Sequence, residues 1–155
     1  MSEYLFDQLK VVRNNTLNAV KGLSENQVDK IPAGFNNNIR WNLGHIYLVQ
    51  ERFAFGFTEI PMLLPEGFLG LFGKDTKPSD WTIQPPSLNE LIKLLEDQTD
   101  RIQEAFKERL DEVLAAPWTM PSGLTLKTVR EFLTFSMYHE GMHVQAIKFL
   151  HRFGS

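Results

Sequence analysis

Residues 132–150, FLTFSMYHEGMHVQAIKFL, contain two histidines one helical turn apart, His139 and His143. At about 100° of rotation per residue, this stretch forms a helix whose apolar side chains share one face; they are Phe132, Phe135, Ala146, Ile147 and Leu150. Both histidines lie in the middle of that face, where each imidazole needs polar partners. Because imidazoles at positions i and i+4 can converge on one ion, the stretch predicts a buried metal-binding pair.

The 155-residue chain is long enough to bury one substantial core, and we expect a single domain over residues 1–155. Its 43% hydrophobic and 23% charged residues are typical of a globular protein. The net charge of −3 lacks the basic excess of nucleic-acid-binding proteins, so neither a nucleic acid nor an anionic membrane is an expected partner. The absence of cysteine excludes disulfides and thiolate metal ligands.

The N-terminal residues carry charges at Glu3, Asp7 and Lys10, where a signal peptide needs an unbroken apolar run. No stretch approaches the roughly 18 consecutive apolar residues of a membrane span. We therefore expect a cytoplasmic protein.

Helical periodicity predicts four long helices, at residues 3–22, 39–57, 88–110 and 125–152. The S-x-x-Q and S-x-x-E forms of a capping box occur at Ser24 and Ser87, and an asparagine of residues 36–38 can cap the second long helix. We expect Thr125 to cap the fourth helix and Gly154 to follow its end. No alternation indicates a sheet, so the fold class is all-α.

Residues 58–86 interrupt the helical pattern with five prolines and three glycines, and within them we expect only a helical turn at residues 66–72. A connection of this length is unusual inside a small domain. In a four-helix bundle it allows the second and third helices to run in the same direction, which a short loop cannot do. The sequence thus predicts a four-helix bundle with a long connection between helices two and three.

The segment His139-Glu140-Gly141-Met142-His143 also matches H-E-x-x-H, the zinc motif of metalloproteases. The continuation with a third downstream histidine is missing, and no strand is expected to align a peptide substrate. A zincin-type hydrolase is therefore a minor alternative. Another alternative is that these are core histidines whose nitrogens are satisfied by hydrogen bonds, or that one of them lies at an interface.

His45 is the remaining histidine with a predicted inward position, because it shares one side of its helix with Trp41 and Asn42. It can complete a three-histidine site with a free coordination position, as catalytic zinc sites have. Nitrogen ligands suit several divalent ions, and we expect zinc or nickel first.

Two segments, Ile39-Arg40-Trp41-Asn42-Leu43-Gly44-His45-Ile46 and residues 139–147, HEGMHVQAI, resemble the DinB/YfiT-like family of metal-binding four-helix proteins. The resemblance covers essentially the whole chain and implies an up-down-down-up bundle. It also implies that His45, His139 and His143 are the metal ligands. Characterised members include S-transferases that use bacillithiol or similar thiols and a thiol-dependent isomerase. One difference is Val144-Gln145-Ala146, where many relatives have a Gly-Gln pair.

Glu140 borders the predicted site, at about 100° from His139 and about 60° from His143. It is a candidate general base or a residue that orients a ligand, and the alternative is a partly solvated helix residue. Ser136 is expected to hydrogen bond to the backbone of its own helix, and His151 to have a structural role in the last turn. A group of phenylalanines can line a ligand pocket or a dimer interface; they are Phe53, Phe55, Phe57, Phe68 and Phe72.

Two functions are consistent with these features. The first is a divalent-metal-dependent enzyme whose open site activates a small thiol substrate, with the S-transferase activity that the resemblance implies. The second is a non-catalytic scaffold or binding module that the metal stabilises. The aromatic residues and the family resemblance favour a homodimer in either case.

Overall fold

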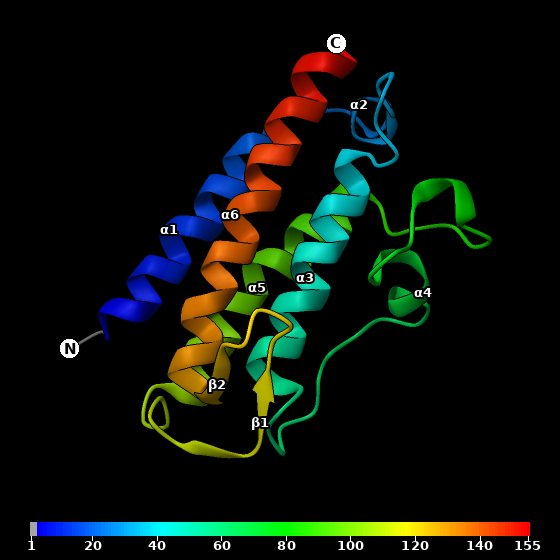
Figure 1. Ribbon diagram of the computed structural model, residues 1–155. Coiled ribbons are helices and arrows are strands. Elements are labelled where there is room, and N and C mark those ends of the chain that lie inside the picture. The colour runs from blue at the N-terminus through cyan, green and yellow to red at the C-terminus, as the bar shows by residue number, and fades with distance from the viewer. Residues whose placement is uncertain (1–2) are drawn as a thin grey trace.

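The computed structural model describes residues 3–155 and shows a bundle of four long helices (Figure 1). These are α1 (Tyr4–Ala19), α3 (Ile39–Phe55), α5 (Leu88–Phe106) and α6 (Val129–Gly154). In Figure 1, α1 and α6 run upward while α3 and α5 run downward, so the up-down-down-up prediction is confirmed. The shorter elements are α2 (Glu25–Asp29), α4 (Phe68–Phe72), the 3-10 helix η1 (Pro78–Asp80), β1 (Val113–Thr119) and β2 (Thr125–Thr128).

The predicted helix caps are largely present. Ser24 and Ser87 each form a complete capping box, and the Asn38 side chain accepts a hydrogen bond of 2.8 Å from the Trp41 amide. These side chains satisfy amide donors that have no partner in the first turn of a helix. Helices α2, α5 and α3 therefore begin where the sequence predicts.

The start of the last helix differs from the prediction. Thr125 does not cap α6, because it belongs to β2 and pairs with Thr119 of β1. The cap is Thr128, which forms a capping box with Glu131. The antiparallel hairpin of β1 and β2 was not predicted, since Pro117 and a register irregularity between Val113 and Trp118 remove regular alternation. At the other end, Gly154 is the last residue of α6 and does not follow it.

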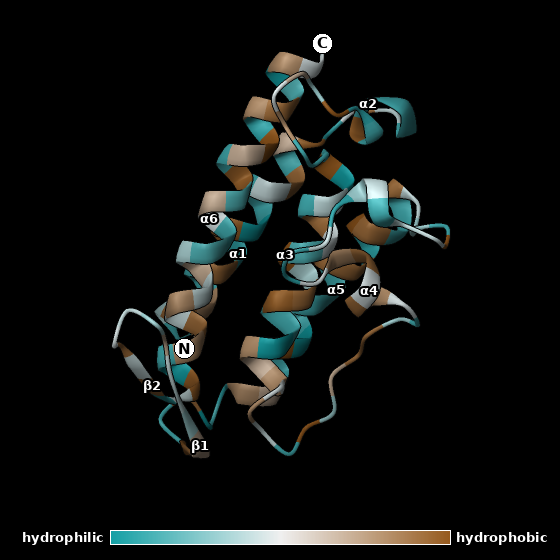
Figure 2. Ribbon diagram, turned by 45° about the vertical axis from the view of Figure 1, so that its right-hand side comes forward, coloured by the Kyte–Doolittle hydropathy of each residue, from teal (hydrophilic) through white to brown (hydrophobic). Residues whose placement is uncertain are grey.

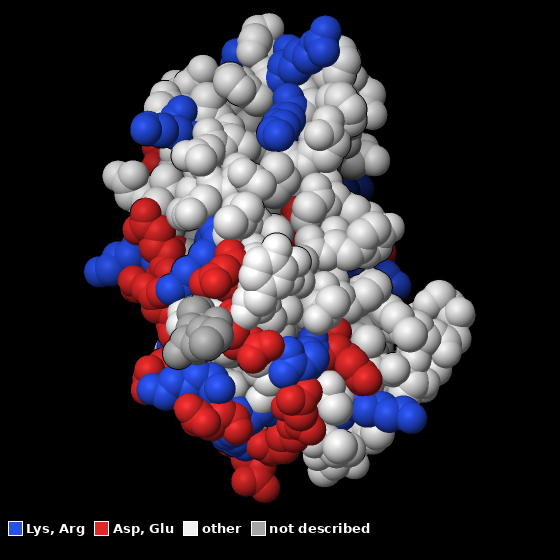
Figure 3. All heavy atoms as spheres, turned by 90° about the vertical axis from the view of Figure 1, so that its left-hand side faces the viewer, with Lys and Arg blue, Asp and Glu red and all other residues white. Residues whose placement is uncertain are grey.

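Two clusters of buried apolar side chains fill the bundle along its length. Figure 2 shows hydrophobic (brown) and hydrophilic (teal) segments alternating along the long helices, as in amphipathic helices. Of the phenylalanines singled out in the sequence, Phe53, Phe55, Phe68 and Phe72 are buried in these clusters. On the face where α1 lies, Figure 3 shows acidic and basic side chains interspersed, with no field of one sign. Among residues 3–155, no helix has the length and apolar composition that a bilayer crossing needs.

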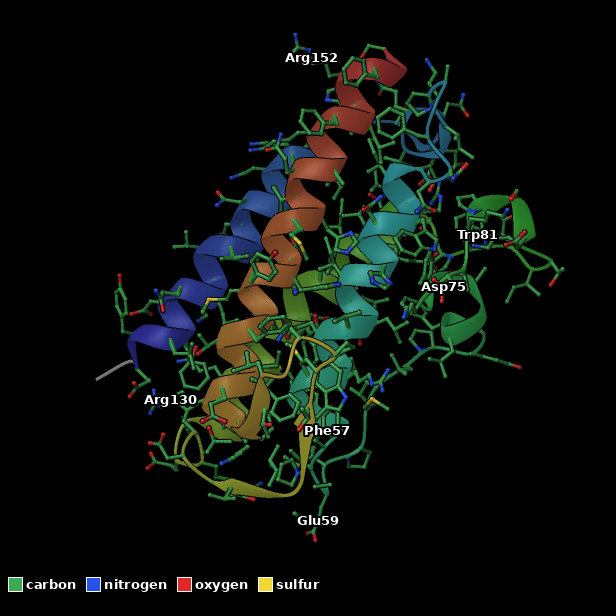
Figure 4. The ribbon with its side chains drawn as sticks, viewed as in Figure 1. Phe57, Glu59, Asp75, Trp81, Arg130 and Arg152 are labelled. Atoms are coloured by element: carbon green, nitrogen blue, oxygen red, sulfur yellow. The ribbon has the colours of Figure 1, made fainter. Side chains whose placement is uncertain are left out.

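The long connection between α3 and α5 folds back along α3, and it carries α4 and Trp81 on one flank of the bundle (Figure 4). The Trp81 indole donates to the Leu71 carbonyl at 2.8 Å, and the Trp41 indole donates to Thr76 at 2.9 Å. The first bond closes the connection on itself, and the second fixes it to the first turn of α3. Phe72, at the end of α4, is fully buried there.

Gly44 permits this close approach. A Cβ atom at position 44 would lie 2.4 Å from the Phe72 ring, whereas nothing lies within 4 Å of a Cβ at Gly141, on the outside of α6. We expect Gly44→Ala to lower the free energy of unfolding by about 1–3 kcal/mol through overpacking. Gly141→Ala, the matched control in a helix interior, is expected to raise it by about 0.5–1 kcal/mol. Urea denaturation of both variants measures the two effects, and equal values for them would contradict this explanation.

Candidate metal centre

His45 of α3 and His139 and His143 of α6 come together between these two helices. One ring nitrogen from each lies within 4.8 Å of the others, and no other group of this kind exists within residues 3–155. The three ring centroids are 4.5–5.2 Å apart. Nitrogens bound to one ion at about 2.0–2.1 Å can be little more than 4 Å apart, so small side-chain rotations suffice to bring all three onto a metal.

Hydrogen bonds select the tautomer of two of these histidines. His45 Nδ1 lies 2.6 Å from the Phe72 carbonyl oxygen, and His143 Nδ1 lies 2.8 Å from Asn42 Oδ1. The Phe72 carbonyl oxygen can only accept a hydrogen bond. The atom of Asn42 that faces His143 is also an acceptor oxygen, because the Asn42 amide nitrogen donates to the Asn38 carbonyl. Each Nδ1 therefore carries the proton, and each Nε2 keeps its lone pair for an ion. Partners of this kind orient the histidine ligands of metal sites.

The surroundings of the three rings favour the neutral imidazoles that metal ligands must be. Burial, reinforced by the neighbouring imidazoles, lowers the pKa of His139 to about 3. Burial and the nearby His45 lower the pKa of His143 to about 4, although Glu140 acts in the opposite direction. Burial also lowers the pKa of His45, against the effect of its bond to Phe72. All three rings are thus uncharged at neutral pH.

Aromatic side chains surround the histidines. The Trp41 ring stacks on His45, with centroids 4.5 Å apart and planes 13° apart. Phe53 meets His139 edge-on, with centroids 6.5 Å apart. These contacts reduce the access of water to the nitrogens and limit the ring rotamers. Trp41 and Asn42, which the sequence placed beside His45, thus both contact the site.

Asn42 offers a direct test of how the site is oriented. We expect Asn42→Leu, which removes the acceptor for His143, to weaken divalent-metal binding by about 10–100-fold. Asn42→Asp keeps an acceptor oxygen at the same position and is expected to lose much less affinity. Competition against a chromophoric chelator measures both constants, and equal affinities for the wild type and Asn42→Leu would show that this hydrogen bond does not orient a ligand.

Glu140 does not belong to the histidine cluster. Its side chain is only 3% exposed and lies between α6 and α1, where both carboxylate oxygens accept bonds from Arg13 at 2.8 and 3.1 Å. The Thr16 hydroxyl donates to the same carboxylate at 2.6 Å. The alternative of a partly solvated residue is therefore wrong, and the contacts favour a role in orientation over one as general base.

The prediction for Ser136 is confirmed, and that for His151 stays a prediction. The Ser136 hydroxyl is buried and donates to the Leu133 carbonyl of the same helix at 2.6 Å. His151 is exposed in the last turn of α6, away from the cluster. The sequence missed the Phe72 carbonyl as a partner of His45, because residues 58–86 have no periodicity from which to place a backbone atom.

The donor set fits a divalent ion. Three neutral nitrogens from two adjacent helices are a ligand set of catalytic zinc sites, and no carboxylate or further histidine joins them in the part of the chain that the structure describes. A divalent ion bound by His45, His139 and His143 would therefore keep a position for water or a substrate. The same nitrogen donors suit zinc, nickel, copper and iron.

Comparisons with known proteins agree with this fold. The chain is similar to the crystal structure of a conserved protein from Enterococcus faecalis, with a TM-score of 0.68, 14% sequence identity, and coverage of 99% of this chain and 97% of the other. A comparison with curated proteins finds no match. The family model described as the DinB superfamily matches residues 8–147, which include all three histidines. The chain therefore belongs to the DinB superfamily.

Proposed function

We propose that the protein is a metal-dependent enzyme that activates a low-molecular-weight thiol for transfer to an electrophile. The observation that carries this proposal is the cluster of His45, His139 and His143, which offers three neutral nitrogens and no fourth protein ligand within residues 3–155. When bound, a divalent ion supplies Lewis acidity that lowers the pKa of a coordinated thiol or water. Neutral ligands leave the full charge of the ion available for this effect.

The residues around the histidines prepare the site for such chemistry. Asn42 and Phe72 hold two imidazoles in the tautomer that binds metal, and Trp41 and Phe53 shield the rings from water. In the proposed reaction the thiolate sulfur forms a bond to an electrophilic carbon, and the carbon's bond to its leaving group breaks with the electron pair on that group. The thiol proton passes to solvent, because Glu140 is occupied by Arg13.

The choice of a thiol as substrate rests on the DinB resemblance. A thiol substrate in turn suggests a cellular compartment for the reaction. We place the reaction in the cytoplasm, where small thiols are kept reduced. A zincin-type hydrolysis has less support, since the glutamate of H-E-x-x-H must reach a metal-bound water. In this structure that glutamate, Glu140, is held in the α1–α6 interface.

The test is a thioether-forming assay with protein loaded with zinc or nickel, a chromogenic aryl halide and a panel of small thiols. We expect a rate that disappears on chelation, returns on metal addition, and is lost in His139→Ala but kept in His151→Ala. The scaffold alternative predicts a different result. Loaded protein would accelerate no thiol addition, while chelation would lower the melting temperature.

We also propose that the protein works as a homodimer through the outer face of α6. Four apolar side chains on that face are 45–62% exposed; they are Tyr138, Met142, Phe149 and Phe153. Their spacing is symmetric about the middle of the stripe, so antiparallel packing of two α6 helices places Tyr138 against Phe153 and Met142 against Phe149. Light scattering should give twice the mass of one chain for the wild type and the mass of one chain for the double variant Tyr138→Glu/Phe153→Glu. A monomeric wild type would refute the dimer.

A further inference from the structure

A polar layer crosses the interior of the bundle and includes one side chain or more from each of the four long helices. Its members are Arg13 and Thr16 of α1, Glu51 of α3, Gln98 and Arg101 of α5, and Glu140 of α6. Apart from Arg101, each is at most 3% exposed. Buried polar groups of this kind need complete hydrogen bonding.

Arg13 is the centre of this layer. Its guanidinium binds both oxygens of Glu140, donates to Gln98 Oε1 at 3.1 Å, and also donates to the Leu95 carbonyl. Because Gln98 Oε1 accepts from Arg13, the Gln98 amide nitrogen is left to donate to Glu51 at 2.8 Å. Glu51 in turn receives both terminal nitrogens of Arg101. A continuous chain of hydrogen bonds thus joins Glu140 to Glu51.

The two ends of this chain lie on the two helices that carry the histidines. Glu140 directly follows His139 and precedes His143 by one turn, and Glu51 follows His45 on α3. In each helix the histidines face the α3–α6 seam, while the glutamate faces α1 or α5. The polar layer therefore holds both ligand-bearing helices through α1 and α5, on sides other than the seam that contains the metal centre.

We propose that Arg13 is a positioning residue of the metal centre, acting through Glu140 to fix the rotation of α6 about its own axis. This inference rests on the metal site of the proposed function. An imidazole nitrogen lies about 6 Å from the helix axis, so a rotation of about 10° moves it by about 1 Å. Ligand sets tolerate displacements of only about 0.5 Å. A small rotation of α6 consequently misplaces His139 and His143 together.

Stability alone does not explain the buried Arg13–Glu140 pair. Replacing a buried ion pair with apolar residues of similar volume is often neutral or stabilising, because the desolvation of two charges offsets their attraction. A bidentate pair that also engages Thr16 and Gln98 instead defines one angular setting of α6 relative to α1 and α5. This geometric role is what the experiment must separate from stability.

The experiment compares three variants at a temperature where each is folded: Arg13→Met, Arg13→Met/Glu140→Met and Leu9→Ala. The double variant avoids the unpaired buried carboxylate that destabilises the single variant. Leu9→Ala is the matched control. Leu9 is buried on α1 one turn before Arg13, and its replacement by alanine removes only packing contacts. Chelator competition gives the zinc affinity of each variant, and the absorption of the cobalt-loaded protein reports the coordination geometry.

We expect both Arg13 variants to bind zinc about 10–100-fold more weakly than the wild type and to show an altered cobalt spectrum. The double variant should do so even though its melting temperature returns towards the wild-type value, and Leu9→Ala should retain its affinity within about threefold. Wild-type affinity in the double variant would overturn the proposal. So would a loss in Leu9→Ala as large as that in the double variant.

A second measurement uses the metal-free protein. Long-range proton–nitrogen spectra of the imidazoles should show His143 as the Nδ1–H tautomer in the wild type and Leu9→Ala, and a mixture of tautomers in the double variant. An unchanged tautomer there would refute positioning by Arg13. A wild type that binds no divalent ion would refute the proposed function, and this spectrum would still decide the role of Arg13.

Discussion

Protein purified without a histidine tag is expected to contain close to one divalent ion per chain, and His45→Ala is expected to bind that ion about a thousandfold more weakly. The size of this loss follows from the number of ligands. Protein zinc sites supply roughly 12 kcal/mol of binding free energy, so one of three equal ligands accounts for about 4 kcal/mol. A loss of about 4 kcal/mol corresponds to about a thousandfold in the dissociation constant.

His45 is the most informative of the three ligands to remove, because it lies on α3 while the other two lie on α6. A site that needs both helices fails without it, whereas a pair of histidines on α6 can still bind weakly. Inductively coupled plasma mass spectrometry measures the bound metal, and chelator competition measures the affinity. His151→Ala, which removes an exposed histidine outside the cluster, is the matched control. Equal metal contents in His45→Ala and His151→Ala would mean that the cluster does not hold the ion.

The histidine cluster could be predicted from sequence because it depends on helical periodicity. Rotation of about 100° per residue places His139 and His143 on one face, and the same rule turns His45 inward. The structure brings these three residues together between α3 and α6. Periodicity also predicted the number of long helices and the position of the long connection. These features repeat every few residues, so errors at single positions do not change them.

The features that were not predicted depend on single tertiary contacts. One such feature is the burial of Arg13, a residue type that is normally exposed, which is possible because Glu140 lies opposite it. Arg13 lies four residues after Leu9 and three before Thr16, which places it on the buried face of α1. This spacing indicates burial, although a charged side chain indicates exposure. The hairpin of β1 and β2 has only a short and irregular pairing, so no local pattern indicates it. Hydrogen bonds across 82 to 127 positions of sequence cannot be read from periodicity.

Replacement of Glu51 is expected to have the largest effect on stability. Its side chain is fully buried and accepts bonds from Arg101 at 2.7 and 2.8 Å, from Gln98 at 2.8 Å and from the Leu63 amide at 2.8 Å. Glu51→Gln leaves Arg101 without its counter-charge and places a donor against other donors. Breaking one partner of a buried ion pair costs about 3–5 kcal/mol, a substantial part of the roughly 5–15 kcal/mol that stabilises a whole domain.

Denaturation in urea measures this loss, and the melting temperature should fall by about 6–20 °C for a chain of this size. Glu104→Gln is the matched control, because Glu104 forms an exposed pair with Lys107 that contributes about 0–1 kcal/mol. Glu51 also holds the Leu63 amide near the start of the long connection, and Phe72, near the middle of that connection, supplies its carbonyl to His45. Hydrogen exchange in Glu51→Gln should therefore increase in residues 58–72 before it increases in α1. Equal effects of the two substitutions would show that the buried carboxylate contributes no more than a surface pair.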